Sequence, residues 1–421
     1  MVEKWITANY FNNTIQTVKV FKTLTVSLNP CFFIRIKFNI FIKITNVNPL
    51  KILIYSTFFL AIFSACKSES EKLADESVKR NAIIDSTITQ FKKNLLVQQM
   101  DSVFSRSKFN GSISVMQNGK ILYEEYNGFE NFKTKTPLDS NSVFAIGSVS
   151  KQFTAVMILL LEEQGKLKVE DQVSKYLKEF QSKTFENITI GQLLNHTSGL
   201  SDSGSGLLSK SGTKFNYSNK GYRYLGELIE EASGKTYGEN AKELFANAVM
   251  KHSSTSDLFV NHHFSSAYLG NSSRFQEVEN MPKRLSNSEI SVGAGGVLST
   301  VSDLHQWNFA LYNGKILKPE SLRKFMSQST ENNHPILGKV GYGFGIMMNE
   351  GKPKSYFHTG YVKGSPSLNI YYPETKTSVV ILSNIADEAK GKNAVFNPHK
   401  EVKKNMEVVE NAMIETKKDL H

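Results

Sequence analysis

Three short groups of residues carry side chains that could together do covalent chemistry at a serine. The first is Ser148-Val-Ser-Lys151, which places a hydroxyl and an amine three residues apart at the predicted start of a helix. At that spacing the two side chains lie on one helix face, so Lys151 can hydrogen-bond Ser148. A helix N-terminus and partial burial both favour a neutral amine and a developing alkoxide, which is what a lysine general base needs.

The Ser-x-x-Lys pattern is weak evidence alone, because it recurs from Ser64, Ser105, Ser211 and Ser321. Two further groups strengthen it. Tyr217-Ser-Asn219 stands just before a second predicted helix, and His358-Thr-Gly360 stands at the end of a predicted strand, positions from which side chains project into a cleft. Acyl transfer needs a nucleophile, a base, a second proton carrier and donors for an oxyanion, and these residue types supply all four.

The elements that must position these groups follow from hydrophobic periodicity. Helical spacing predicts a first helix over about 80–104, a helix that starts near Ser148 and stops at Gly165, and one closed by Gly234. A hairpin is predicted from strands 111–116 and 120–126 around Gln117-Asn-Gly119. The last third predicts strands over 342–348, 354–360, 367–372 and 377–382, whose short connections require antiparallel pairing.

This order predicts an α+β fold, an α/β sandwich in which an antiparallel sheet is flanked by N- and C-terminal helices. The sheet domain is discontinuous, formed by residues 81–165 and 300–421, and an all-helical domain over 166–299 is inserted between its halves. Residues 197–206, rich in Ser and Gly, are expected to form an exposed flexible loop.

At this point the chain resembles the serine β-lactamase and penicillin-binding protein superfamily, in the branch of class C β-lactamases, DD-peptidases and related esterases. The resemblance covers about residues 108–385 and implies a β-lactamase/transpeptidase-like fold. It rests on the three groups above and on their flanking segments, which are 144–154, 188–200, 215–222, 293–303 and 342–345.

Carried over residue by residue, the resemblance implies Ser148 as nucleophile and Lys151 as its proton acceptor. Tyr217 would pass the proton to the leaving group, and Asn219 would hold the substrate amide. The backbone N–H groups of Ser148 and Tyr361 would form the oxyanion hole, and substrate would also bind at the third group, His358, Thr359 and Gly360, with Thr359 a candidate for holding a substrate carboxylate.

The third group departs from the Lys-Thr-Gly of lactamases because it begins with His358, as in some DD-peptidase and esterase members. An imidazole is largely neutral above about pH 6.5, so a fixed positive charge is weakened there. The predicted function is a serine hydrolase that acts through a Ser148 acyl-enzyme on D-amino acid peptides or small esters and amides. A true β-lactamase is one alternative, and an inactive homologue that binds cell-wall peptides or a protein partner is another.

The net charge does not indicate a nucleic-acid partner. The chain of 421 residues has a formal charge of +11, but residues 1–66 hold seven basic residues and one acid, which leaves 11 − 6 = +5 for the rest. The nine histidines show no metal-ligand spacing, and His262-His263 stands in a polar segment. Gly341, Gly343 and Gly345 alternate along a predicted strand without completing a dinucleotide pattern, so neither a metal nor a cofactor is expected.

The leader points to the cell envelope. Lys51 and the apolar run 52–65, which is too short to span a bilayer, are typical of a signal peptide. Phe63-Ser-Ala-Cys66 resembles the lipobox of bacterial lipoproteins, which makes Cys66 the lipidation site, residues 1–66 the leader and 67–80 a polar tether. We expect a monomer anchored by lipid at the bacterial cell envelope, on the periplasmic or surface side, that acts on a small-molecule or peptidoglycan-type substrate.

Overall fold

The computed structural model describes residues 69–106, 109–260, 263–279, 281–286 and 291–420. The predicted leader and its lipidation site Cys66 lie outside these residues. By internal contacts the chain divides into Met1–Ala74 and Asp75–His421, and the architecture below is that of the second unit. Among the described residues, no helix combines the length and apolar character that crossing a bilayer requires.

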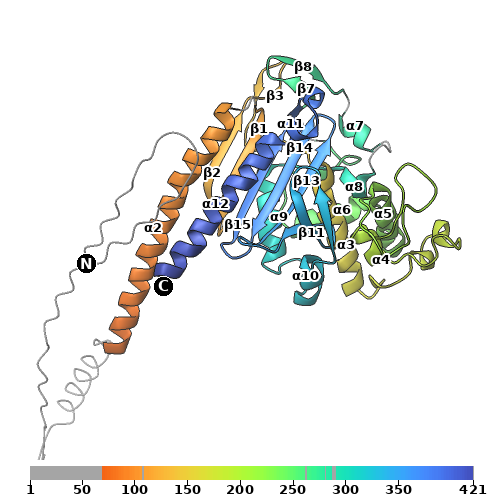
Figure 1. The fold of residues 1–421 in the computed structure, drawn as a ribbon, viewed down its shortest axis with the longest axis horizontal. Helices are drawn as coiled ribbons and strands as arrows, with labels where there is room; N and C mark the ends of the chain where they lie inside the picture. Colours follow the sequence, from red (N-terminus) through yellow and green to blue (C-terminus); the bar gives the residue numbers. More distant parts are fainter. Residues whose placement is uncertain (1–68, 107–108, 261–262, 280, 287–290, 421) are drawn as a thin grey trace, which may run out of the picture. The chain divides into compact units, whose positions relative to one another are not determined.

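An eight-stranded antiparallel sheet forms the centre of this unit, in the order β10-β11-β12-β13-β14-β15-β1-β2 (Figure 1). Its strands are β1 (Gly111–Gln117), β2 (Lys120–Asn127), β10 (Thr330–His334), β11 (Gly338–Tyr342), β12 (Met347–Asn349), β13 (Ser355–Val362), β14 (Ser365–Tyr372) and β15 (Thr377–Ser383). β1 pairs with β15 from Gly111↔Ser383 to Gln117↔Thr377, so the two ends of the chain share one sheet. The predicted hairpin and antiparallel pairing are confirmed.

Helices cover both faces of the sheet. On one face α2 (Glu69–Arg106) and α12 (Asn397–Leu420) lie side by side (Figure 1) and pack Leu96, Met100, Val402 and Met406 against the strands. Inside this layer a buried ion pair joins Lys92 to Glu410 at 2.6 Å. On the other face lie α3 (Lys151–Glu163) and α9 (Val301–Tyr312).

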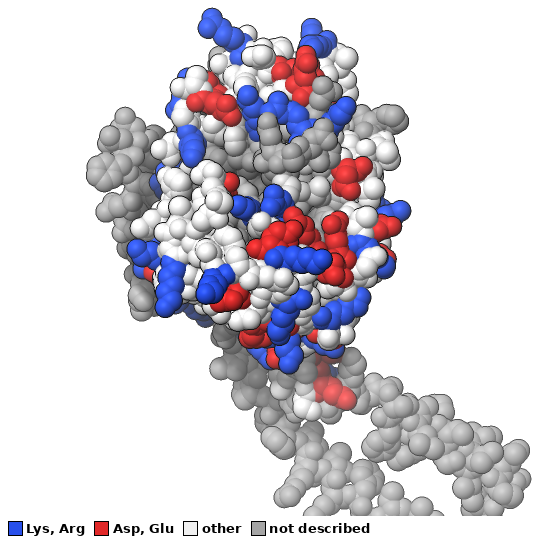
Figure 2. All heavy atoms as spheres, turned by 90° about the vertical axis from the view of Figure 1, so that its right-hand side faces the viewer, with Lys and Arg blue, Asp and Glu red and all other residues white. Residues whose placement is uncertain are grey.

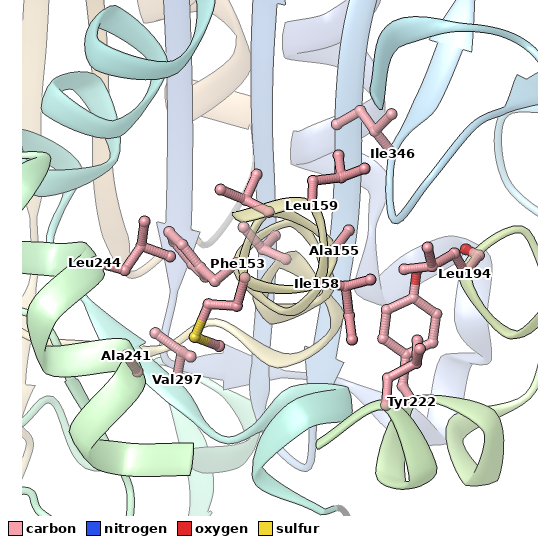
Figure 3. Packing of buried hydrophobic residues seen from close by; sticks show 14 of the residues in the cluster. Phe153, Ala155, Ile158, Leu159, Leu194, Tyr222, Ala241, Leu244, Val297 and Ile346 are labelled. Carbon is pink, nitrogen blue, oxygen red and sulfur yellow. The ribbon is translucent and has the colours of Figure 1, made fainter. Parts of the chain in front are cut away.

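α3 is the helix that carries the first group, and it is buried on all sides. Ten of its thirteen residues are buried, among them Phe153, Ile158 and Leu159. Figure 3 shows these side chains pointing outward around the helix axis toward α5 (Asn219–Ser233), α6 (Tyr237–Asn247) and the sheet. A helix that is apolar all round must be covered on all sides, and this fixes α3 rigidly in the interior.

Some predictions need correction. The strand predicted over 342–348 is two strands, because Gly343 donates to Ile346 O (2.9 Å) in a tight turn, and alternating glycines bring no side chains to hold a ladder. The region predicted to be all helical also contains β6 (Ser254–Thr255), β7 (Tyr268–Asn271), β8 (Arg274–Glu277) and β9 (Val297–Ser299). β9 pairs with β5 (Phe144–Ala145), and β7 pairs with β16 (Ile385–Ala386). Both partners are remote in sequence, so a local pattern does not reveal them.

From Glu69 onward the predicted polar tether is helical, as the first part of α2. The division into a sheet domain and an insert at residues 166 and 300 stays a prediction. On the face shown in Figure 2, basic and acidic side chains are intermixed, with no broad basic patch.

Candidate active site

Ser148 and Lys151 meet at the start of α3. Ser148 lies in a short 3₁₀ turn, η1 (Gly147–Ser150), that leads directly into the helix. Lys151 Nζ is 3.1 Å from Ser148 Oγ, 2.8 Å from Asn219 Oδ1 and 2.7 Å from the Ala294 carbonyl oxygen. Asn219 Oδ1 and the Ala294 carbonyl can accept both N–H groups of a neutral amine, which leaves its lone pair for the Ser148 proton.

Burial sets the protonation of this amine. Lys151 is fully buried. Its burial lowers its pKa to about 7, and the carboxylate of Asp202 opposes this only in part. Near neutral pH a large share of Lys151 is thus an uncharged amine.

A second described Ser-x-x-Lys group behaves differently. In α10 (Pro319–Met326), Lys324 forms an ion pair with Glu162 at 3.0 Å. Partial burial lowers the pKa of Lys324, but the hydrogen bond and charge of Glu162 outweigh it and raise that pKa above its ordinary value. Lys324 is a charged ammonium and not a base for Ser321. The environment, more than the spacing, distinguishes Lys151.

Tyr217 contacts both Ser148 and Lys151. Its ring centroid is 4.9 Å from Lys151 Nζ, and its hydroxyl forms a hydrogen bond with Ser148. Burial raises the pKa of Tyr217, although the Ser148 bond acts in the opposite direction. A phenol that keeps its proton can donate it, so Lys151 and Tyr217 are suited to opposite halves of a proton transfer.

The N-terminus of α5 positions the second group. Ser218 is the N-cap, and its Oγ accepts from Gly221 N at 3.0 Å. The Asp202 carboxylate accepts from Ser218 Oγ (2.7 Å) and from the backbone N–H groups of Asn219 and Lys220 (both 3.0 Å). An anion at a helix N-terminus is stabilised by the helix dipole, so Asp202 anchors the turn that carries Tyr217 and Asn219.

The third group lies on β13, against η1. Gly360 and Gly147 allow this contact: a Cβ at 360 would lie 1.9 Å from Ile146 O, and one at 147 would lie 2.6 Å from Tyr361 N. The backbone at Tyr361 therefore lies directly against the turn that carries Ser148, and the role of their N–H groups as oxyanion donors stays a prediction. Thr359 is nearly buried, and its Oγ1 is 3.4 Å from Nε2 of His334.

His358 is placed differently from a residue that binds substrate through its ring. It is fully buried, with Nε2 3.0 Å from the Tyr342 hydroxyl and Nδ1 2.6 Å from Thr359 O. Burial lowers its pKa to about 3, and the nearby charge of Lys151 acts in the same direction. The ring is neutral and has protein partners at both nitrogens, and its predicted role in substrate binding stays a prediction.

The sequence reasoning missed Asp202, His196 and His334. Asp202 lies in the Ser/Gly-rich loop predicted to be flexible, sixteen residues before Ser218, and no local signal connects the two. His196 stands inside a segment quoted for the resemblance, and a structural signal is its backbone φ of +61°, which non-glycine residues seldom adopt. Among the described residues no cluster of His, Cys, Asp and Glu could hold a metal ion.

Comparison with known proteins places this geometry in context. The family model described as Beta-lactamase matches residues 85–396. Penicillin-binding protein 4* of Bacillus subtilis is 28% identical over 346 residues, covering 73% of this chain and 75% of that protein. Teichoic acid D-alanine hydrolase of Staphylococcus aureus (strain MRSA252) is 27% identical over 343 residues, covering 77% and 80%.

Solved structures agree on the fold. A penicillin-binding protein from Bacillus halodurans superposes with a TM-score of 0.62 at 22% identity, covering 72% of this chain and 99% of that one. A D-amino acid amidase from Ochrobactrum anthropi gives a TM-score of 0.62 at 19% identity, covering 76% and 99%. The predicted α+β fold class and the predicted superfamily are confirmed.

Proposed function

This chain belongs to the β-lactamase family and is a serine hydrolase of that family, and we propose that it works through an acyl-enzyme on Ser148. Lys151 takes the proton as the Ser148 oxygen attacks a carbonyl carbon. Tyr217 relays this proton to the leaving group as its bond to the carbonyl carbon breaks, and water then hydrolyses the Ser148 ester. Asn219 orients the acyl donor, and the N–H groups of Ser148 and Tyr361 stabilise the oxyanion. The observation that carries this proposal is the buried Lys151 amine, 3.1 Å from Ser148 Oγ.

We propose D-amino acid peptides, or small esters and amides of D-amino acids, as the substrate class. Two relatives are named for D-alanine hydrolysis from teichoic acid and for penicillin binding, and a structural neighbour is named as a D-amino acid amidase. A neutral His358 in place of a lysine favours substrates held by hydrogen bonds over those held by a fixed positive charge. Efficient β-lactam hydrolysis is accordingly the less favoured alternative.

Covalent labelling tests the nucleophile. We expect a fluorophosphonate probe or a fluorescent penicillin to add one adduct to the wild-type protein by intact mass, and none to Ser148→Ala. Ser321→Ala is the matched control, because Ser321 is also a serine three residues before a lysine. Labelling that survives Ser148→Ala contradicts the proposal, and so does the absence of labelling by both probes.

The two probes also separate the activities. Persistent penicillin adducts indicate a DD-peptidase, rapid loss of the adduct indicates a β-lactamase, and labelling by fluorophosphonate alone indicates an esterase. D-alanyl esters and D-alanyl-D-alanine peptides, assayed by release of D-alanine, then identify the substrate.

We propose further that the protein acts at the bacterial cell envelope as a lipid-anchored monomer. The support is the leader pattern that ends at Cys66 and the cell-wall names of the relatives. Metabolic labelling with an alkyne fatty acid should mark the wild type and not Cys66→Ser. Equal labelling of both contradicts the anchor, and sedimentation analysis tests the monomer.

A further inference from the structure

A line of hydrogen bonds runs beneath the site from the second group to the third. His196 Nδ1 is 3.1 Å from Ser218 N, and His196 Nε2 is 3.1 Å from the Tyr342 hydroxyl. The same hydroxyl is 3.0 Å from Nε2 of His358, whose Nδ1 is 2.6 Å from Thr359 O. All three side chains are fully buried. None of the three side chains takes part in the proton transfers proposed above, although the line connects the second group with the third.

The two ends of this line fix its direction. Ser218 N–H can only donate, so His196 Nδ1 accepts and the proton of the neutral ring is on Nε2. At the other end the Thr359 carbonyl can only accept, so His358 Nδ1 carries a proton and Nε2 of the neutral ring accepts. Tyr342 therefore accepts from His196 and donates its one proton to His358. The Tyr222 hydroxyl, which also contacts Tyr342, donates its own proton to Leu194 O at 2.7 Å.

We propose that Tyr342 is a positioning residue for the reaction at Ser148. Its hydroxyl joins His196 and His358 into one directed chain of hydrogen bonds, which fixes the turn carrying Tyr217 and Asn219 relative to the strand carrying Thr359 and Tyr361. The kinetic part of this inference rests on the proposed function, whereas the assignment of protons does not.

This chain of hydrogen bonds also keeps a second positive charge out of the site. The titratable groups that face the two imidazoles are Lys151 from α3, His334 from β10, and Tyr217 and Tyr222 around the N-terminal part of α5. A proton added to His196 would place an N–H against Ser218 N–H, and one added to His358 would place an N–H against the proton that Tyr342 donates. Each imidazolium would break a bond of the chain and repel protonated Lys151.

The proton positions can be measured without any activity. In the full chain labelled with ¹⁵N-histidine, we expect His196 as the Nε2–H tautomer and His358 as the Nδ1–H tautomer, with neither titrating from pH 5 to 8. His196→Asn and His358→Asn identify the two sets of signals. An Nε2–H tautomer for His358, or protonation of either ring in this range, overturns the proposal.

The positioning role is tested by Tyr342→Phe, which removes only the joining hydroxyl. Tyr372→Phe is the matched control, because it removes a buried hydroxyl without a hydrogen-bond partner from β14 of the same sheet. The measurement is the second-order rate of fluorophosphonate labelling from pH 5 to 9. We expect Tyr342→Phe to lower this rate about 10- to 100-fold, as for partners that orient metal ligands, and to add a second ionisation to the acid limb.

The outcomes are distinct. If Tyr342→Phe and Tyr372→Phe share the wild-type rate and pH profile, Tyr342 has no positioning role. If the wild type labels with no probe but shows the two expected tautomers, the proposed function fails while the proton assignment stands. If Tyr342→Phe does not fold, the tautomers of His196 and His358 in the wild type still decide whether the directed chain of hydrogen bonds exists.

Discussion

The pH dependence of acylation gives the sharpest test of Lys151 as the base. The amine must be uncharged to accept the Ser148 proton, so acylation should rise with pH as Lys151 loses its own proton. With its pKa lowered to about 7 by burial, about half of the Lys151 population is neutral at pH 7 and about one tenth at pH 6. At the ordinary lysine value of 10.5, only about one molecule in 3,000 would be neutral at pH 7.

Asp202→Asn perturbs this balance in a known direction. The Asp202 carboxylate raises the pKa of Lys151, so its removal should move the acid limb to lower pH. Asp202 is exposed, and pairs at exposed positions are screened, so the limb should move by only about 0.1 to 0.7 pH unit. The difference should shrink in high salt. Asparagine can still accept from the α5 N-terminus, which preserves most of the cap.

The assay is the second-order rate of fluorophosphonate labelling between pH 5 and 10, for wild type, Asp202→Asn and the control Asp85→Asn on α2. We expect a midpoint near pH 7 for the wild type and the control, and a lower one for Asp202→Asn. A wild-type midpoint above pH 9 would refute the argument from burial, and a midpoint that rises in Asp202→Asn would refute the role assigned to Asp202.

Substitutions at Gly360 and Ser218 test the packing beside the site, and substitutions at Lys92 and Glu410 test the α2–α12 layer. Gly360→Ala should lower the free energy of unfolding by about 1–3 kcal/mol and abolish labelling, because its Cβ would lie 1.9 Å from Ile146 O; denaturant titration and intact mass measure both. Ser218→Ala should lower the free energy of unfolding by about 1 kcal/mol and slow labelling. Ser218→Thr keeps a capping hydroxyl, so its stability and labelling rate should stay near those of the wild type. Lys92→Met should lower the free energy of unfolding by about 3–5 kcal/mol, because it leaves the Glu410 carboxylate buried without its ion-pair partner. The double variant Lys92→Met/Glu410→Leu should recover most of this loss in a denaturant titration.

The elements that local sequence patterns determine were predicted well. The hairpin 111–126, the helix that begins beside Ser148 and the helix closed by Gly234 all follow from period, C-caps and turn residues, and all are present. Hydrophobic periodicity is a property of residues close in sequence, so it can be read without knowledge of the fold. The order of these elements also predicted one sheet built from both ends of the chain, as the pairing of β1 with β15 shows.

What the sequence did not reveal is long-range. Asp202 reaches Ser218 through a loop whose composition predicts flexibility, and β9 finds its partner β5 more than 150 residues away. The 342–348 strand was wrong because apolar alternation does not report a glycine turn. The burial that lowers the pKa of Lys151 and the ion pair that raises that of Lys324 are tertiary effects, although the two Ser-x-x-Lys patterns look alike.

The replacement of a lysine by His358 has a larger consequence than its ordinary pKa suggests. From sequence, a histidine would regain positive charge below about pH 6.5. In the folded protein burial lowers its pKa to about 3, so His358 contributes no charge at any pH where Lys151 is an effective base. In the proposed mechanism the third group then holds an acyl donor through hydrogen bonds from Thr359 and from the β13 backbone. A neutral leaving group, such as the alcohol of a D-alanyl ester, loses little in such a site, whereas a carboxylate beside the scissile bond loses its charged partner. D-alanyl esters should therefore turn over faster than penicillins acylate, and the reverse order would refute this account of His358.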